Sequence, residues 1–229
     1  CQPKIKSFSQ PDYFEYSGAA GGYIDKYGYP FCRGRIFKHI EKDLGQYDSV
    51  ADIFWASGAC FLIRSETFWE VGGFDADFFA HMEEIDLCWR ILSIQKRIVC
   101  NPQSTVYHIG GGTLSTENPY KTYLNFRNNL LMLYKNATKR ELKKIFFTRW
   151  FLDYIAAFSM LLEGKATNAK SIIKARKDFR KMRTSFKTKR ENCQRIQKIN
   201  NLQKLILPQS LLWLYFINRK TKFSDLYQK

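Results

Sequence analysis

The chain has 229 residues, of which 45% are hydrophobic and 16% aromatic, and this composition excludes a chain that is disordered throughout. Residues 1–119 carry 11 basic and 15 acidic side chains, whereas residues 120–229 carry 26 basic and 6 acidic ones, which together give the net charge of +16. The basic half predicts a negatively charged partner, either an anionic membrane surface or a nucleic acid.

The six cysteines never form a Cys-x-x-Cys pair, so the sequence lacks the ligand spacing of a zinc finger. The chain begins at Cys1 with no signal-peptide pattern. Scattered cysteines in such a chain predict reduced thiols in a cytosolic protein.

The first 112 residues alternate apolar, β-rich runs with helical stretches, which predicts an α/β arrangement. The expected elements, in chain order, are a strand in 53–63, a short helix with Ser65 as its N-cap, a helix over 83–95, and strands over 97–101 and 105–109 separated by a turn at Pro102.

From Pro119 onward the pattern becomes helical, and Pro119 suits the first position of a helix. The run 142–162 is apolar nearly all round, but Arg149 and Asp153 interrupt it four residues apart. This interruption favours a buried or interfacial helix over a membrane-spanning one. A basic helix is expected over 165–195.

A second apolar run, 205–217, is broken by Pro208 and is too short to span a bilayer. Its aromatic residues and its lysine and arginine flanks suit a membrane interface.

The most informative segment is acidic. Residues 72–75 read Gly-Gly-Phe-Asp, residues 78–79 are two phenylalanines, residues 83–87 read Glu-Glu-Ile-Asp-Leu, and Arg90 follows. Residues 102–108 then read Pro-x-x-x-x-x-His. Adjacent carboxylates in the first turn of a helix, with an imidazole arriving from a later strand, can place a general base beside a divalent cation.

These motifs resemble the C-terminal half of the catalytic domain of family 2 glycosyltransferases, which are inverting enzymes with the GT-A fold. The resemblance is strong over 54–135 and weaker over 14–183, and it is greatest to bacterial cell-surface polysaccharide enzymes, including rhamnosyltransferase-like ones. One departure is Glu83-Glu84, where the family most often has Glu-Asp. A base that is one methylene longer must lie slightly further from its target.

The family's donor-binding half carries a strand-ending Asp-x-Asp, and no such motif precedes Phe54. We therefore expect the C-terminal portion of a longer enzyme, with the donor-binding half missing. Residues 1–118 are expected to form the C-terminal half of a GT-A catalytic domain. Residues 119–229 are expected to form a helical, basic extension that associates with membranes.

By resemblance, Glu84 is the general base, Glu83 is its neighbour, and Asp86 orients or caps. The alternative is that acids in a first helical turn only complement the helix dipole. By resemblance again, His108 completes the ligands of a Mg²⁺ or Mn²⁺ ion that bridges the donor diphosphate. A histidine after a strand is otherwise structural.

The loop containing Trp55, Ser57 and Gly58 resembles the family's acceptor loop, in which an aromatic ring stacks on a sugar. Core packing is the alternative for Trp55. Arg127 could meet a diphosphate bidentately, or it could form a surface salt bridge.

The resemblance implies an enzyme that moves a sugar from a UDP- or dTDP-sugar donor to a glycan or lipid-linked acceptor. It would lie in the cytoplasm, peripherally at the inner face of the bacterial cytoplasmic membrane, without a nucleic-acid partner. Two alternatives stay open: a non-catalytic fragment whose basic helices bind a membrane or a partner, and a nucleic-acid-binding module driven by the basic half.

Overall fold

The computed structural model describes residues 1–110, 118–197 and 202–227, which form two compact units. Unit 1 contains 1–73, 87–110 and the described part of 198–229, and unit 2 contains 74–86 and the described part of 111–197. This division differs from the boundary expected at residue 118, because the acidic segment 74–86 belongs with the helices.

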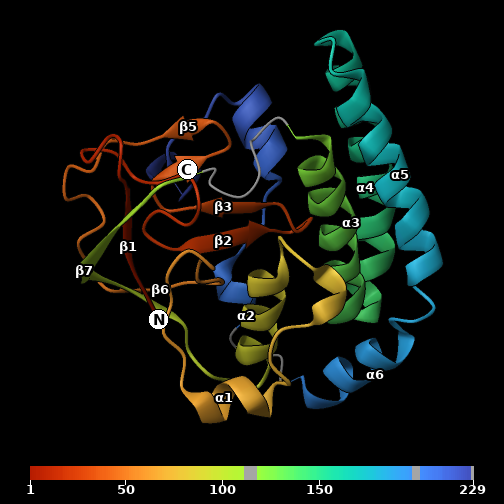
Figure 1. Cartoon of the computed structure of the whole chain (residues 1–229), viewed down its shortest axis with the longest axis horizontal. Helices are drawn as coiled ribbons and strands as arrows, with labels where there is room; N and C mark the ends of the chain where they lie inside the picture. Colours follow the sequence, from red (N-terminus) through yellow and green to blue (C-terminus); the bar gives the residue numbers. More distant parts are fainter. Residues whose placement is uncertain (111–117, 198–201, 228–229) are drawn as a thin grey trace. The chain divides into compact units, whose positions relative to one another are not determined.

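A three-stranded sheet in unit 1 has the order β1 (Gln2–Ser7), β7 (Val99–His108), β6 (Ala51–Asp52). Strands β1 and β7 run parallel and side by side, while β6 runs antiparallel to β7 (Figure 1). The sequence predicted two strands, over 97–101 and 105–109, but the structure has the single strand β7 there. The expected turn survives as a bulge, because the pairing moves from Asn101 directly to Thr105 and skips Pro102, which has no N–H to donate.

A five-stranded sheet completes the β-structure of unit 1. Its order is β5 (His39–Ile40), β4 (Arg35–Ile36), β3 (Pro30–Cys32), β2 (Gly22–Asp25) and β8 (Ile206–Leu207). Strand β8 pairs parallel with β2, whereas the other pairs are antiparallel.

The C-terminal segment 202–227 therefore does not continue the helical extension that was expected there. The Leu211 N–H donates to the Asp25 carboxylate at 2.8 Å, and the Phe223 ring lies 5.1 Å from that of Tyr23. These contacts place the segment within unit 1.

Helix α1 (Ser65–Glu70) begins after Arg64, so Ser65 is its first residue and not its N-cap. Helix α2 (Glu83–Ser93) begins in unit 2 and ends in unit 1, and it matches the helix expected over 83–95 apart from its last two residues. The strand expected in 53–63 is absent. Residues 53–57 are buried without belonging to a strand.

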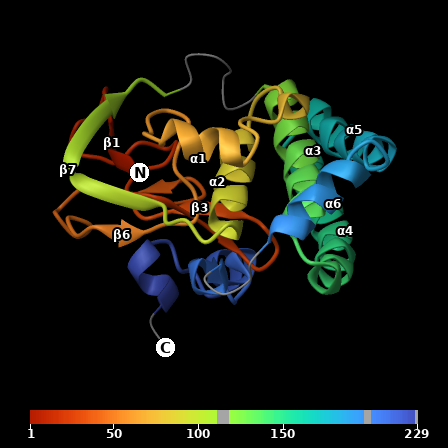
Figure 2. The ribbon, with the colours of Figure 1, turned by 90° about the horizontal axis from the view of Figure 1, so that it is seen from below.

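Unit 2 is built on four helices: α3 (Pro119–Asn136), α4 (Lys139–Leu162), α5 (Ala166–Met182) and α6 (Lys187–Ile196) (Figure 2). Pro119 occupies the first turn of α3, as expected, and Asn118 caps it by accepting the Tyr120 N–H at 2.8 Å. The single basic helix expected over 165–195 is divided into α5 and α6.

Helix α4 is long and apolar enough, by length and composition, to cross a membrane. Its buried face includes Arg149 and Asp153, which are 1% and 0% exposed. Ala157 of the same face packs against Ala169 and Ile172 of α5. Helix α4 is thus packed along one side. This agrees with the buried or interfacial helix that Arg149 and Asp153 predicted within the apolar run.

Candidate active site

The acidic motif lies in unit 2, where 74–86 forms a loop that ends in the first turn of α2. Glu83, Glu84 and Asp86 all belong to that turn. Acids are favourable there because the N-terminal end of a helix carries a partial positive charge. Their surroundings nevertheless differ sharply.

Asp86 is fully buried and fully occupied by α3. Its carboxylate accepts a hydrogen bond from Asn136 at 2.7 Å and forms an ion pair with Lys135 at 2.9 Å. Asp86 therefore anchors the first turn of α2 to α3, and its oxygens face protein groups.

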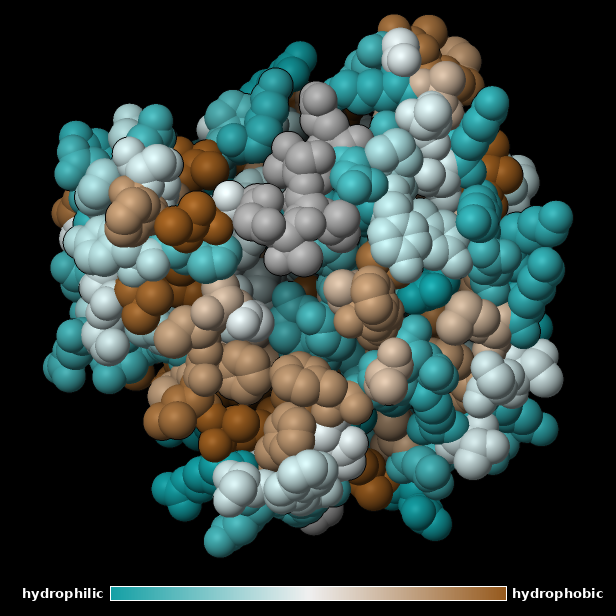
Figure 3. Space-filling view, in the orientation of Figure 1, coloured by the Kyte–Doolittle hydropathy of each residue, from teal (hydrophilic) through white to brown (hydrophobic). Residues whose placement is uncertain are grey.

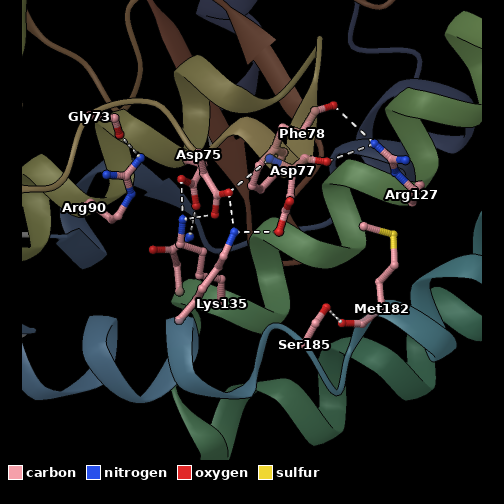
Figure 4. A network of polar contacts seen from close by, with 12 residues as sticks. Gly73, Asp75, Asp77, Phe78, Arg90, Arg127, Lys135, Met182 and Ser185 are labelled. Atoms are coloured by element: carbon pink, nitrogen blue, oxygen red, sulfur yellow. Dashed lines mark hydrogen bonds and ion pairs between the residues drawn. The ribbon is translucent and has the colours of Figure 1, made fainter.

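Asp75 lies in the same pairing network (Figure 4). It pairs with Lys135 at 2.8 Å and with Lys189 of α6, which also pairs with Asp77. Burial disfavours the charged carboxylate, but the two ammonium groups outweigh burial and hold the pKa of Asp75 below its ordinary value. The Gly-Gly-Phe-Asp motif thus ends in a carboxylate that fixes the loop to the helices.

Glu83 and Glu84 each keep one buried carboxylate oxygen, Oε2, that has no hydrogen-bond partner. Burial raises the pKa of Glu83, and burial together with the negative charge of Glu83 raises the pKa of Glu84 to about 7. A carboxyl group that titrates near neutral pH is suited to accept a proton from a substrate.

His81 also belongs to this site, although the sequence analysis did not assign it a role. Its Nε2 is buried without a hydrogen-bond partner, and burial and then the charge of Lys121 lower its pKa. Residues 81–84 thus bring together three polar side chains with an unpaired buried atom, a feature that is uncommon outside functional sites. The only signal in the sequence was the His-x-Glu spacing itself.

The backbone leading into the acidic pair is strained. Phe79, His81 and Met82 have φ angles of 64°, 66° and 72°, a region that residues other than glycine rarely adopt. Such a conformation persists only where its surroundings hold it in place.

Two neighbouring residues of α3 hold this loop. The Asn128 side-chain amide lies 2.8 Å from each of the carbonyl oxygens of Phe78, Ala80 and His81. Arg127 donates to the Phe78 carbonyl at 3.2 Å and to that of Asp77 at 3.3 Å (Figure 4). Arg127 therefore positions the loop instead of forming the surface salt bridge considered above, and its contact with a diphosphate stays a prediction.

A buried polar network continues from the loop into the bundle. Asn129 lies 3.9 Å from the Met82 sulfur and accepts a hydrogen bond from Arg149. Arg149 pairs with Asp153 at 2.9 Å, and Arg176 of α5 pairs with the other oxygen of Asp153. Arg149 and Asp153, the two charges that interrupt the apolar run 142–162, thus lie at the centre of an ion network.

The other predicted site residues lie in unit 1. Trp55 is 4% exposed, donates from its ring nitrogen to the Tyr23 carbonyl at 2.9 Å, and lies so close to Gly22 that a Cβ there would be 2.1 Å from the ring. Of the two alternatives for Trp55, the structure has core packing, which leaves no ring face for a sugar.

Ser57 is likewise buried, and its hydroxyl donates to the Ser17 carbonyl while its N–H donates to Gln2 at 2.8 Å. Gly58 is exposed at the turn that follows. Ser57 therefore has a structural role, and the contact of Gly58 with an acceptor stays a prediction.

His108 ends β7, and its Nδ1 lies 3.4 Å from the carboxylate of Glu15. Among the described residues, no group of three or more His, Cys, Asp or Glu side chains is arranged to hold a metal ion. The described part of the chain therefore provides two candidate ligands and not a complete metal site.

The comparison with protein families decides the identity of this arrangement. The model described as "Glycosyltransferase like family 2" matches residues 11–181, which is well over half of the chain. The chain belongs to this family. The match and the mixed sheets confirm the predicted fold class, an α/β portion of a GT-A domain followed by helices.

Two relatives of this family 2 domain come from Mycobacterium tuberculosis, strains CDC 1551 / Oshkosh and ATCC 25618 / H37Rv, and both are named N-acetylglucosaminyl-diphospho-decaprenol L-rhamnosyltransferase. Each is 41% identical over 54 residues, which is 24% of this chain and 18% of the relative. The match thus spans less than a fifth of the length of these relatives.

Proposed function

We propose that this family 2 domain carries the acceptor side of an inverting glycosyltransferase, with Glu84 as the general base. The observation that carries the proposal is the unpaired, buried Oε2 of Glu84, together with a pKa of about 7. A structural carboxylate would be paired as Asp86 is. A base must keep an oxygen free for the substrate.

The proposed step is a single displacement. An acceptor hydroxyl hydrogen-bonds to the Glu84 carboxylate and gives up its proton to it as the hydroxyl oxygen attacks the anomeric carbon. The bond from the anomeric carbon to the donor diphosphate breaks on the opposite face, and the nucleoside diphosphate leaves with the bonding electrons. The configuration of the sugar is therefore inverted, and Glu84 then releases its proton to solvent.

Glu83 and His81 assist in this proposal without accepting the proton. Burial and then the charge of Glu83 raise the pKa of Glu84 to about 7, which favours proton transfer from the acceptor. His81 has a lowered pKa, so it is neutral at physiological pH and can hydrogen-bond an acceptor hydroxyl through its unpaired Nε2.

The proposed donor is a UDP- or dTDP-sugar, and the proposed acceptor is a glycan or a lipid-linked sugar used in cell-surface polysaccharide synthesis. The names of the two relatives support a deoxyhexose donor and a polyprenyl-diphosphate-linked acceptor. Such acceptors lie in the membrane, so we place the protein peripherally at the cytoplasmic face of the bacterial membrane, without a nucleic-acid partner.

A divalent cation, Mg²⁺ or Mn²⁺, stays part of the proposal only through His108. The described residues do not form a complete metal site. His108 and Glu15 supply two ligand groups, and a protein-bound cation of this class needs more oxygen ligands.

The test is transfer activity of Glu84→Gln in the complete gene product, with Glu83→Gln as the matched control. Loss of the base should lower kcat by about 100-fold or more, while the KM for the nucleotide sugar changes little. Glu83→Gln should cost much less. Full activity of Glu84→Gln, or an equal loss in both variants, would show that Glu84 is not the base.

A further inference from the structure

The outward face of α4 exposes a continuous row of large apolar side chains. Phe147 is 69% exposed, Phe158 is 61% exposed and Leu162 is 74% exposed. The full row consists of Phe147, Trp150, Phe151, Tyr154, Ile155, Phe158, Leu161 and Leu162. In Figure 3, hydrophobic residues gather at the tip of the α4–α5 hairpin, where this row ends.

These eight residues form a single stripe because they recur every three or four positions. At 3.6 residues per turn they lie within an arc of about 140°. The same arc, one to two turns earlier, contains the exposed residues Arg140, Lys143 and Lys144 and no acidic residue. The face is therefore basic at its beginning and aromatic over the rest of its length.

The opposite face of α4 fixes the orientation of this stripe. Arg149 and Asp153 are buried there, Asp153 pairs with both Arg149 and Arg176 of α5, and Ala157 packs on Ile172. Rotating α4 to bury the stripe within unit 2 would expose the apolar contacts and break the ion network. The apolar side chains are thus held outward by the rest of the unit.

We propose that this face of α4 docks in the plane of an anionic lipid surface. Five aromatic rings would enter the boundary between headgroups and acyl chains, and Arg140, Lys143 and Lys144 would meet lipid phosphates. A second copy of the chain fits less well, because it would present the same positive charge. The charge pattern of the stripe therefore favours lipid as its occupant.

The inference is independent of Glu84, because it rests on the surface of α4 and requires no sugar transfer. A bundle held at the membrane in this way would keep the protein where lipid-linked acceptors lie. Failure of lipid binding would leave the assignment of the base untouched, and an active Glu84→Gln variant would leave the docking face untouched.

The experiment is co-sedimentation of the chain with vesicles of phosphatidylcholine alone or of phosphatidylcholine with phosphatidylglycerol at about 3:1. Binding is expected to the anionic vesicles and to weaken as salt rises. The triple variant Phe147→Ser/Phe151→Ser/Phe158→Ser should lower the partition coefficient by at least about 10-fold. A matched triple in unit 1, Phe8→Ser/Leu62→Ser/Trp69→Ser, also replaces exposed apolar side chains and should bind as the unchanged chain does.

Charge reversal gives a second arm that does not depend on the apolar variant being folded. Lys143→Glu/Lys144→Glu should lower binding to anionic vesicles by at least about 10-fold, whereas Lys177→Glu/Lys181→Glu on α5 should lower it much less. Equal losses in the two pairs, or unchanged binding in the phenylalanine variant, would overturn the proposal. A lipid-free dimer that the phenylalanine variant abolishes would assign the face to a second copy instead.

Discussion

Unit 2 contains two buried polar regions that differ in how their charges are paired. Between α4 and α5, Arg149 and Arg176 share the carboxylate of Asp153. At the start of α2, Glu83 and Glu84 each leave a buried oxygen unpaired. Burying an unpaired polar atom is unfavourable for folding. Both oxygens of Asp153 are paired, as in a scaffold, whereas the unpaired oxygens of the second region, here called the glutamate region, support its proposal as the active site.

The largest expected effect is on the paired region. Asp153→Ala leaves two buried guanidinium groups without their carboxylate and should lower the free energy of unfolding by about 3–5 kcal/mol. Urea denaturation of the chain measures this loss. The control is Glu163→Ala, which removes one partner of an exposed pair with Lys165 and should cost at most about 1 kcal/mol. Similar costs for both variants would mean that the buried network is not a scaffold.

Asn128→Leu tests the support of the glutamate region, because it preserves size but removes the amide nitrogen that lies 2.8 Å from three loop carbonyls. Unpaired buried carbonyls should lower the free energy of unfolding by about 2–3 kcal/mol. Because the strained loop positions Glu84, turnover should fall as well while the KM for the donor is retained. If the variant were destabilised but kept full turnover, the conformation of the loop would not be required for catalysis.

A substitution in the glutamate region itself should raise the free energy of unfolding at high pH, whereas the two substitutions above lower it. The folded-state pKa of Glu84 is raised to about 7, so the folded protein binds a proton more tightly than the unfolded chain does, and stability falls as pH rises from about 4.5 to 7. Glu84→Gln removes this dependence. Relative to the unchanged chain, it should be more stable at pH 8, by at most about 3 kcal/mol, and nearly equal at pH 4. Thermal unfolding at both pH values measures the difference, and a variant that is less stable at pH 8 would contradict it.

Local sequence patterns were sufficient to predict the elements of this comparison. The start of α2 at its acidic pair, the start of α3 at Pro119 and the spacing of Arg149 and Asp153 all depend on neighbouring residues, and the structure confirms each of them as an element or as a buried pair. The α/β class followed from the alternation of apolar and helical runs, and the GT-A fold from the resemblance that the acidic motif carries.

Contacts between distant residues could not be predicted in this way. The left-handed backbone of His81 depends on Asn128, which is 47 residues away, and the burial of Trp55 depends on close approach to Gly22. The pairing of β8 with β2 involves only two residues from each strand, so it leaves no periodic pattern. The buried position of His81 beside the glutamates and the end of the helical region at α6 were missed for these reasons.

The smallest and most specific effect concerns the coupling between the two glutamates. The negative charge of Glu83 contributes to the raised pKa of Glu84, so Glu83→Gln should lower the pKa of Glu84. The base must be deprotonated to act, and kcat/KM should therefore rise with pH through a midpoint near 7 in the unchanged enzyme and through a lower midpoint in the variant. The pH profile of kcat/KM in the complete gene product measures this shift, with Asp77→Asn, an acid in the same unit that pairs with Lys189, as the control that should leave the midpoint in place. A midpoint that moves to higher pH in Glu83→Gln would mean that Glu83 is not the charge that Glu84 senses. A midpoint that does not move would assign the titration to another group.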